Sequence, residues 1–224
     1  MKVLAIETAT MLGGVAILSE EDGLIGELRV NVRIAHAERL MSAIQWLLNA
    51  SQLSIKDISA FAVSIGPGSF TGLRIGLSTA KGFSYSTGKP LLPVLTLDAF
   101  ARTLPFCTYL ICPMLDARKD EVYTALYKWE DGLCKKIISE MAITPKEFLK
   151  EIKGETVFIG DGALIYKKLI MDTLKDNAVF APPGKMLPSA GGAAEIAIEM
   201  LKNDINIDPL SLTPFYIRKS EAEI

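Results

Sequence analysis

Apolar and polar positions follow the same order of patterns twice along the 224-residue chain. The first half opens with three short apolar or alternating runs, KVLAIETA, GGVAILSE and LIGELRVN, which predict three strands separated by glycine-containing turns. A helical period follows over residues 36–53, then the strand-like run ISAFAVSI and a second helix over residues 71–87. The run PLLPVLTL predicts another strand, and residues 98–104 predict a short helix.

The second half shows the same order of elements. YLICPML, EVYTALYKW and CKKIISEMAI predict three strands, PKEFLKEI a short helix with Pro145 at its first position, and TVFIGDG a further strand. A helix is expected over residues 163–174, then a short strand, NAVFA, and a C-terminal helix that Ser189 would cap. The repetition is one of element order and not of residues.

The repeated order predicts an α/β fold built from two similar halves. A ribonuclease-H-like half consists of an antiparallel three-stranded meander continued by parallel strands, with helices on the faces. Two such halves, each with the order βββαβα, form the actin-like (ASKHA) fold of actin, sugar kinases and Hsp70 ATPases, in which nucleotide binds between the halves. We therefore expect residues 1–104 to form the N-terminal half and residues 105–224 the C-terminal half. It is left open whether the C-terminal helix packs back on the first half.

Composition narrows the classes of function. Half of the residues are hydrophobic, yet no apolar run reaches the roughly 18 residues that a membrane span needs, and the N-terminus reads as a strand and not as a secretory signal. The three cysteines form no C-x-x-C pair, which is typical of the reducing cytoplasm. The net charge is −2, with no extended basic cluster, so we expect the chain not to bind nucleic acid on its own.

The glycine-rich stretch GPGSFTG, residues 66–72, joins a predicted strand to a predicted helix. Such a loop can bind a phosphate, because unpaired backbone N–H groups point out of the positive end of the helix. The alternative is a tight turn that uses glycine for unusual backbone angles and a Ser or Thr as helix cap. No Gly-Lys-Ser/Thr follows, as a P-loop requires, and the spacing differs from the G-x-S-x-G nucleophile motif. The pattern therefore favours a structural turn.

Four residues are candidates for a nucleotide site between the halves: Glu7, Asp116, Arg118 and Gly160. Glu7 lies in the first predicted hairpin, where actin-like phosphotransferases carry an acid, but bulky side chains follow where phosphate needs close backbone approach. Asp116 and Arg118 lie in the equivalent turn of the second half, DARKDEVY, and Gly160 lies in GDGA, which resembles the adenosine loop of that superfamily. The alternatives are a hairpin with a partly buried acid, a structural ion pair and an ordinary strand-to-helix turn.

His36 is the only histidine of the chain. Zinc or iron sites of the H-x-x-x-H or H-E-x-x-H type are therefore excluded. A Ser-His-Asp triad would have to use a histidine that opens a predicted amphipathic helix, where a cap or an interface role is expected instead. We expect no catalytic residue, no metal and no cofactor in this chain.

The first two predicted helices each suggest a second buried surface. On the first, Leu40, Ile44 and Leu47 share the core face, whereas Trp46 lies on the far side. The second contains several glycines, each of which costs about 1 kcal/mol relative to alanine in a helix interior. That cost is offset if another backbone packs closely. Two interpretations remain: both faces pack within the domain, or the helices form an intermolecular interface.

The central run GPGSFTGLRIGLSTAKGF resembles the signature of the TsaB family, also called YeaZ. LAIETAT at the N-terminus, HAERLM in the first helix, LDARKDEVY in the middle and PFYIRKSEAE at the end resemble the family in the same order. The resemblance therefore covers essentially the whole chain. Glu7 departs from the family pattern, which usually has Asp there, and this argues against an intact metal–phosphate site.

The resemblance implies a shortened actin-like fold and a non-catalytic role in forming N6-threonylcarbamoyladenosine in tRNA. TsaB proteins are paralogues and required partners of TsaD, which carries metal-binding histidines and transfers the threonylcarbamoyl group; TsaE joins the pair as an ATPase. TsaB proteins also self-associate through the same helices, so we expect a homodimer when the chain is alone and contact with tRNA only through the complex. An ATPase or phosphotransferase using the cleft is the alternative. The older peptidase names of the family disagree with a single histidine.

The resemblance also places the partner interface on the two helices described above, as a mixed four-helix bundle. Its expected residues are Leu40, Ile44, Trp46 and Leu47 on the first helix and Leu73, Gly76, Leu77, Ala80 and Phe83 on the second. Which side of each helix faces the partner is left open.

Overall fold

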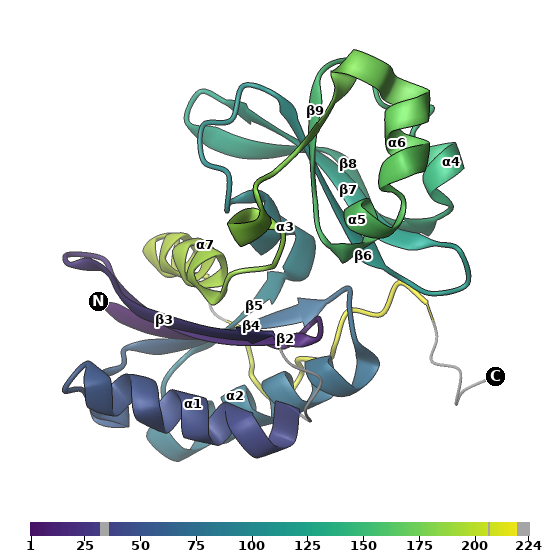
Figure 1. The fold of residues 1–224 in the computed structure, drawn as a ribbon. Helices are drawn as coiled ribbons and strands as arrows, with labels where there is room; N and C mark the ends of the chain where they lie inside the picture. The colour runs from purple at the N-terminus through teal and green to yellow at the C-terminus, as the bar shows by residue number, and fades with distance from the viewer. Residues whose placement is uncertain (32–35, 206, 219–224) are drawn as a thin grey trace. The chain divides into compact units, whose positions relative to one another are not determined.

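The computed structural model describes residues 1–31, 36–205 and 207–218 (Figure 1). The chain divides into two compact units. The first unit comprises the described residues of 1–99 and 189–215, and the second comprises residues 100–188 and 216–218. The division between the units therefore falls five residues before the expected one, and the C-terminal helix belongs with the first unit.

The first unit contains a five-stranded mixed sheet with the strand order β3-β2-β1-β4-β5. The first three strands form an antiparallel meander, and β4 and β5 continue the sheet in parallel with β1. The bounds of the strands are β1 Lys2–Glu7, β2 Leu12–Ser19, β3 Gly23–Asn31, β4 Ala60–Gly66 and β5 Leu91–Leu95. Those of the helices are α1 His36–Ala50, η1 Ile55–Asp57, α2 Phe70–Thr87, α3 Thr96–Ala101 and α7 Ala190–Lys202.

Helices cover both faces of this first sheet: α1 and α2 lie on one face and α7 on the other (Figure 1). Successive side chains of a strand point to opposite faces, and β1 follows this rule. Leu4 and Ile6 pack in the core cluster under α1 and α2, whereas Val3 and Ala5 pack in the cluster under α7. Because both faces are buried, β1 reads in the sequence as a continuous apolar run.

The N-terminus of α7 differs in detail from the expected serine cap. Ser189 precedes the helix, but its hydroxyl donates to the Glu27 carboxylate of β3 at 2.7 Å. The same carboxylate accepts the Gly191 N–H at 3.3 Å. Glu27, which comes from the other end of the unit's sequence, therefore provides the capping acceptor at this positive helix end.

The second unit contains another five-stranded sheet, with the order β10-β9-β6-β7-β8. Its meander is antiparallel, and β9 and β10 continue it in parallel with β6. The strands are β6 Leu110–Asp116, β7 Val122–Glu130, β8 Leu133–Ile143, β9 Thr156–Ile159 and β10 Ala178–Phe180. The helices are α4 Pro145–Phe148, α5 Asp161–Ile165, α6 Lys167–Leu174, η2 Lys175–Asn177 and η3 Pro183–Lys185. The helix expected over residues 163–174 is thus two helices that meet at Tyr166.

Both sheets have the same topology, since each places its first strand in the centre, between the meander and the parallel strands. The chain therefore has the predicted α/β, actin-like architecture of two ribonuclease-H-like halves. Apolar side chains from β6, β7, β9, α4 and α6 form the core of the second unit. Among the described residues, no helix is both long and apolar enough to cross a membrane.

Candidate functional site

The GPGSFTG loop joins β4 to α2 in the first unit and is enclosed by other parts of that unit. A Cβ atom at Gly68 would lie 2.2 Å from the Ala9 carbonyl oxygen, and one at Gly66 would lie 2.4 Å from the Phe215 carbonyl oxygen. The Phe215 N–H also donates to the Ile65 carbonyl at 2.7 Å. The two glycines are therefore required by close backbone approach from both sides, without any ligand.

The same loop is hydrogen-bonded to the first hairpin, between β1 and β2. The Ser69 N–H donates to the Ala9 carbonyl at 2.6 Å, and the Thr8 hydroxyl donates to the Gly72 carbonyl at 2.8 Å. Ser69 also caps α2, since its hydroxyl accepts the Gly72 N–H at 3.3 Å. The chain itself thus engages the loop groups nearest the hairpin, as the structural-turn interpretation expects.

Glu7, the first nucleotide-site candidate, ends β1 and is fully buried. Its Oε1 accepts the Ala9 N–H at 2.6 Å, and the Ser64 hydroxyl donates to Oε2. Burial raises the pKa of this carboxyl from 4.5 to about 7, because desolvation outweighs the lowering effect of the two hydrogen bonds. Glu7 therefore holds the hairpin from inside the core and exposes no oxygen to a ligand.

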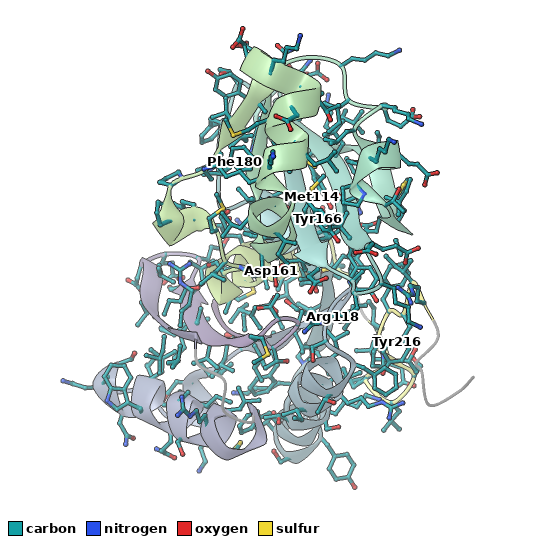
Figure 2. The ribbon with its side chains drawn as sticks, turned by 45° about the vertical axis from the view of Figure 1, so that its right-hand side comes forward. Met114, Arg118, Asp161, Tyr166, Phe180 and Tyr216 are labelled. Atoms are coloured by element: carbon teal, nitrogen blue, oxygen red, sulfur yellow. The ribbon has the colours of Figure 1, made fainter. Side chains whose placement is uncertain are left out.

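In the second unit Asp116 contacts both Arg118 and the GDGA loop, and Figure 2 labels Arg118 and Asp161 of that loop. Asp116 ends β6; its Oδ1 accepts the Arg118 N–H at 2.9 Å, and its Oδ2 lies 3.0 Å from the Arg118 guanidinium. The Asp161 carboxylate accepts the Asp116 N–H at 3.0 Å and the Gly162 N–H at 2.8 Å. The ion pair expected as one alternative is therefore present, and it is formed within the hairpin itself.

Gly160 forms the turn between β9 and α5. Its φ is +111°, and a Cβ atom there would lie 2.0 Å from the Met114 carbonyl oxygen of β6. Glycine is therefore needed for packing within the second unit, as in an ordinary strand-to-helix turn. Glu7 belongs to the first unit and the other three candidates to the second, so a shared nucleotide site between the halves stays a prediction.

The turn of the β6–β7 hairpin has a conformation that the sequence analysis missed. Arg118, Lys119 and Asp120 have φ values of +62°, +52° and +58°, although none of them is glycine. Arg218, near the end of the described chain, donates to the Ala117 carbonyl at 3.2 Å and to the Glu121 carboxylate at 2.7 Å. The sequence contains no glycine signal for this turn, but Arg218 lies in the PFYIRK stretch of the C-terminal motif.

Seven of the nine expected interface residues are buried in the first unit. These are Leu40, Ile44, Leu47, Leu73, Gly76, Leu77 and Ala80. Phe83 is partly buried and stacks on Phe61, with 5.5 Å between the ring centroids, whereas Trp46 is 58% exposed. Most of these side chains therefore attach α1 and α2 to their own sheet, and among the nine Trp46 is the residue that the single chain leaves largely exposed.

Comparison with known proteins places this geometry in a family. A family model described as "TsaD: tRNA N6-adenosine threonylcarbamoyltransferase" matches residues 30–224. The "tRNA threonylcarbamoyladenosine biosynthesis protein TsaB" of Bacillus subtilis is 31% identical over 226 residues, which cover 100% of this chain and 96% of that protein. The chain belongs to the TsaB family.

A second TsaB relative, from Escherichia coli, is 30% identical and covers 99% of this chain and 96% of its own length. The solved structure of YeaZ from Pseudomonas aeruginosa superposes with a TM-score of 0.80 at 23% identity, over 96% of this chain and 100% of that chain. The match to YeaZ shows that the fold of this TsaB chain is shared over its full length.

The outward face of α1 and α2 in this TsaB chain combines exposed aromatic side chains with small ones. On α2, Arg74, Ser78, Gly82 and Tyr85 are exposed and recur every three or four residues, which places them on one side of the helix. A Cβ atom at Gly82 would meet nothing within 4 Å. Nothing within the unit therefore requires glycine at this position.

Within residues 1–31, 36–205 and 207–218, no three or more His, Cys, Asp or Glu side chains are grouped so that they could hold a metal ion. The side chain of His36 and residues 219–224 of the C-terminal motif lie outside the described part of the structure.

Proposed function

We propose that this chain is a non-catalytic subunit required to form N6-threonylcarbamoyladenosine in tRNA. It would bind the catalytic paralogue TsaD and stabilise its active form. Membership of the TsaB family supports the pathway, because the relatives are named for it. The observation that carries the subunit role is the outward face of α1 and α2, where Trp46 and Tyr85 are exposed and Gly82 of α2 is open to close approach.

The composition of this face suits a helix–helix interface. Trp46 is 58% and Tyr85 87% exposed in the single chain, and aromatic residues of these two types often dominate the binding energy of interfaces. Gly82 costs about 1 kcal/mol relative to alanine in an exposed helix. A partner helix that packs against the glycine backbone would offset that cost. Met41, which is 52% exposed on α1, adds an adaptable apolar contact.

The first hairpins of the two units support a non-catalytic role. Glu7 and Asp116 each accept an N–H of their own turn, and the glycine-rich loop is enclosed by Ala9 and Phe215. A phosphate at either hairpin would have to displace these intramolecular contacts. The subunit would therefore act by shaping TsaD and the surface for tRNA in the cytoplasm, with TsaE joining the pair as the ATPase and no cofactor held by this chain.

The same face would form a homodimer when TsaD is absent. Paralogous subunits present related helices, so an isologous contact in the homodimer can be replaced by a similar contact in the heterodimer. Trp46 and Phe83 remain from the nine residues that the sequence suggested, and Met41, Gly82 and Tyr85 join them. The seven buried residues would support this face from behind.

Reconstitution of the modification reaction tests the proposal. TsaD, TsaE, tRNA, ATP and threonylcarbamoyl-adenylate are combined with and without this chain, and modified adenosine is measured by mass spectrometry. We expect modification only when the chain is present. Equal modification without it would disprove the subunit role.

A matched pair of variants tests the face itself. Gly82→Arg should abolish both self-association and TsaD binding in sedimentation, whereas Gly184→Arg should leave both intact. A Cβ atom at Gly184, in η3 of the second unit, also meets nothing within 4 Å, so the two substitutions place the same side chain in open space. Gly76 is unsuitable for this test, because a Cβ atom there would lie 2.3 Å from Thr8 Oγ1. If the Gly82→Arg complex stays intact, the interface lies elsewhere.

The alternative of an ATPase or phosphotransferase makes an opposite prediction. Calorimetry would then detect micromolar ATP binding by the chain alone, and Asp116→Asn would remove it. We expect no ATP binding, since Glu7 exposes no oxygen and Asp116 is engaged within its own hairpin.

A further inference from the structure

The turn of the β6–β7 hairpin has three successive residues, Arg118, Lys119 and Asp120, in the left-handed region of backbone space. L-amino acids other than glycine avoid this region, because the Cβ atom approaches the following carbonyl oxygen. Asn and Asp tolerate it better than Arg and Lys do. Non-glycine residues in such conformations occur frequently at functional sites, so this turn needs an explanation beyond chain reversal.

Contacts from three parts of the second unit hold the turn in this conformation. The Ala117 N–H donates to the Glu121 carbonyl at 3.0 Å, and the Glu121 N–H donates to the Arg118 carbonyl at 3.1 Å. Arg218 binds the same two ends of the turn, at the Ala117 carbonyl and the Glu121 carboxylate. The Asp161 carboxylate fixes the backbone at Asp116, where the hairpin leaves β6.

The feature that this rigid turn presents to solvent is a pair of cations. The Arg118 side chain is 82% exposed, and Lys119 beside it is also exposed. The Asp116 carboxylate holds one side of the guanidinium at 3.0 Å and leaves the other N–H donors of its planar fork open to an oxyanion. Glu121 is paired with Arg218, and Asp120 is the exposed acid of the turn. An exposed ion pair contributes little to stability, but it does orient the Arg118 guanidinium.

An aromatic side chain lies near this turn. Tyr166 stands between α5 and α6, and the charges of Asp120 and Asp116 act on its hydroxyl, although burial is the larger cause of its raised pKa. Figure 2 shows Tyr166, Asp161 and Arg118 toward the same end of the second unit. Unpaired RNA bases stack on aromatic rings of this kind while the adjoining phosphates bind arginine and lysine.

We infer that Arg118 and Lys119, at the tip of the β6–β7 hairpin, bind backbone phosphates of RNA. The inference rests on the proposed function, in which this chain is part of an assembly that acts on tRNA. This turn suits a phosphodiester better than the terminal phosphates of a nucleotide. Terminal phosphates are usually bound by several backbone N–H groups in an enclosed loop. Here the Arg118 N–H is taken by Asp116, and the cations point outward from an exposed turn.

The test measures RNA binding as a function of salt in the assembled complex of this chain with TsaD and TsaE. Labelled tRNA is titrated at several salt concentrations with the wild-type complex and with one carrying both Arg118→Gln and Lys119→Gln. A control complex carries Lys146→Gln and Lys150→Gln, which remove the same charge from exposed lysines beside α4 in the same unit. Sedimentation checks that all three complexes assemble.

We expect weaker RNA binding by the turn variant, and a slope of log affinity against log salt that is smaller by about 1.4, at about 0.7 for each phosphate that is no longer neutralised. The control should match the wild type, and Arg118→Lys, which keeps the charge, should keep the wild-type slope. Equal slopes for the turn variant and the control would overturn the inference while leaving the subunit role intact. Loss of ATP affinity in place of RNA affinity would also overturn it.

Failure of the proposed function gives a different result. In that case the wild-type complex does not assemble or does not modify tRNA. The same salt titration is then made with the chain alone at low salt, where either no measurable RNA binding or a slope that is unchanged by Arg118→Gln with Lys119→Gln removes the inference as well. A smaller slope would keep the RNA contact and reject only the subunit role.

Discussion

The first hairpins of the two units use the same hydrogen bond in opposite surroundings. In each, an acid at the end of the first strand accepts the N–H two residues further on: Glu7 from Ala9 at 2.6 Å, and Asp116 from Arg118 at 2.9 Å. The second carboxylate oxygen then differs, since Ser64 donates to Glu7 whereas the Arg118 guanidinium pairs with Asp116. The repeated fold therefore preserves the local turn but not its environment.

The difference follows from what packs around each hairpin. In the first unit, the glycine-rich loop approaches so closely that Gly68 has no room for a Cβ atom beside Ala9, and Glu7 is fully buried. In the second unit, Arg218 holds the turn from its base and the Arg118 side chain remains 82% exposed. The β1–β2 hairpin is packed into the core of its unit, and the β6–β7 hairpin presents charged side chains to solvent.

Adding a side chain at Gly68 should have the largest effect on the stability of the first unit. In Gly68→Ala, the new Cβ atom would lie 2.2 Å from the Ala9 carbonyl oxygen, which is backbone and moves only if the hairpin moves. We expect the free energy of unfolding of the first unit to fall by roughly 3 kcal/mol or more. Urea unfolding followed by the fluorescence of Trp46, with Trp129 replaced by Phe, reports this unit alone.

Gly82→Ala is the matched control for this prediction. It adds the same methyl group to the same unit, at a position where nothing lies within 4 Å. At protein concentrations where the chain is monomeric, we expect it to stabilise the unit by about 0.5–1 kcal/mol, because alanine is the better helix former. Equal effects of the two substitutions would show that the glycine-rich loop does not pack closely against the first hairpin.

The pH dependence of the first unit should come from Glu7. Folding raises the pKa of this carboxyl from 4.5 to about 7, so the native state binds more protons than the unfolded state within this window. The stabilisation by protonated Glu7 is full below pH 4.5 and is lost as the pH rises toward 7. At about 1.36 kcal/mol for each pKa unit, the loss is about 3 kcal/mol.

Glu7→Gln keeps the shape of the side chain and removes the titration. The free energy of unfolding of the variant, relative to the wild type, should therefore rise by about 3 kcal/mol between pH 4.5 and pH 8. The Trp46 fluorescence assay at a series of pH values measures this difference. A constant difference across the range would contradict the assignment of Glu7 as a buried acid whose two hydrogen bonds do not offset its desolvation.

The order of elements could be predicted from the sequence, and the role of individual residues could not. Buried strands such as β1 appear in the sequence as continuous apolar runs, and the helices appear as apolar residues at helical spacing. The two βββαβα halves could therefore be predicted. Gly76 and Gly82 lie on the same helix and look alike in sequence. Only the fold reveals that Thr8 fills the space beside Gly76 and that nothing fills the space beside Gly82.

The β6–β7 turn was hidden for a related reason. Sequence signals for left-handed backbone depend on Gly, Asn and Asp, but here Arg118 and Lys119 adopt it. Arg218, about a hundred residues further along the chain, holds both ends of the turn. Such long-range support cannot be read from a local pattern. The partner interface stays a prediction for a similar reason, because a helical period identifies a buried face without telling whether the unit itself or a partner buries it.

Removing Arg218 should have the smallest effect of the three changes, and it should be confined to the second hairpin. The side chain of Arg218 is 29% exposed and that of its partner Glu121 32% exposed, so solvent screens the pair. We therefore expect Arg218→Gln to lower the free energy of unfolding by about 1 kcal/mol. Hydrogen exchange should become faster at Ala117 and Glu121, whose N–H groups close the turn, and stay unchanged at Ala9 and Ser69. Lys135→Gln, which breaks the exposed pair with Glu130 at 2.9 Å but touches no turn backbone, is the control and should change neither region. Faster exchange across the whole second unit would mean that Arg218 stabilises the unit globally, and the contrast between a hairpin fixed by the core and one held by local contacts, Arg218 among them, would then be wrong.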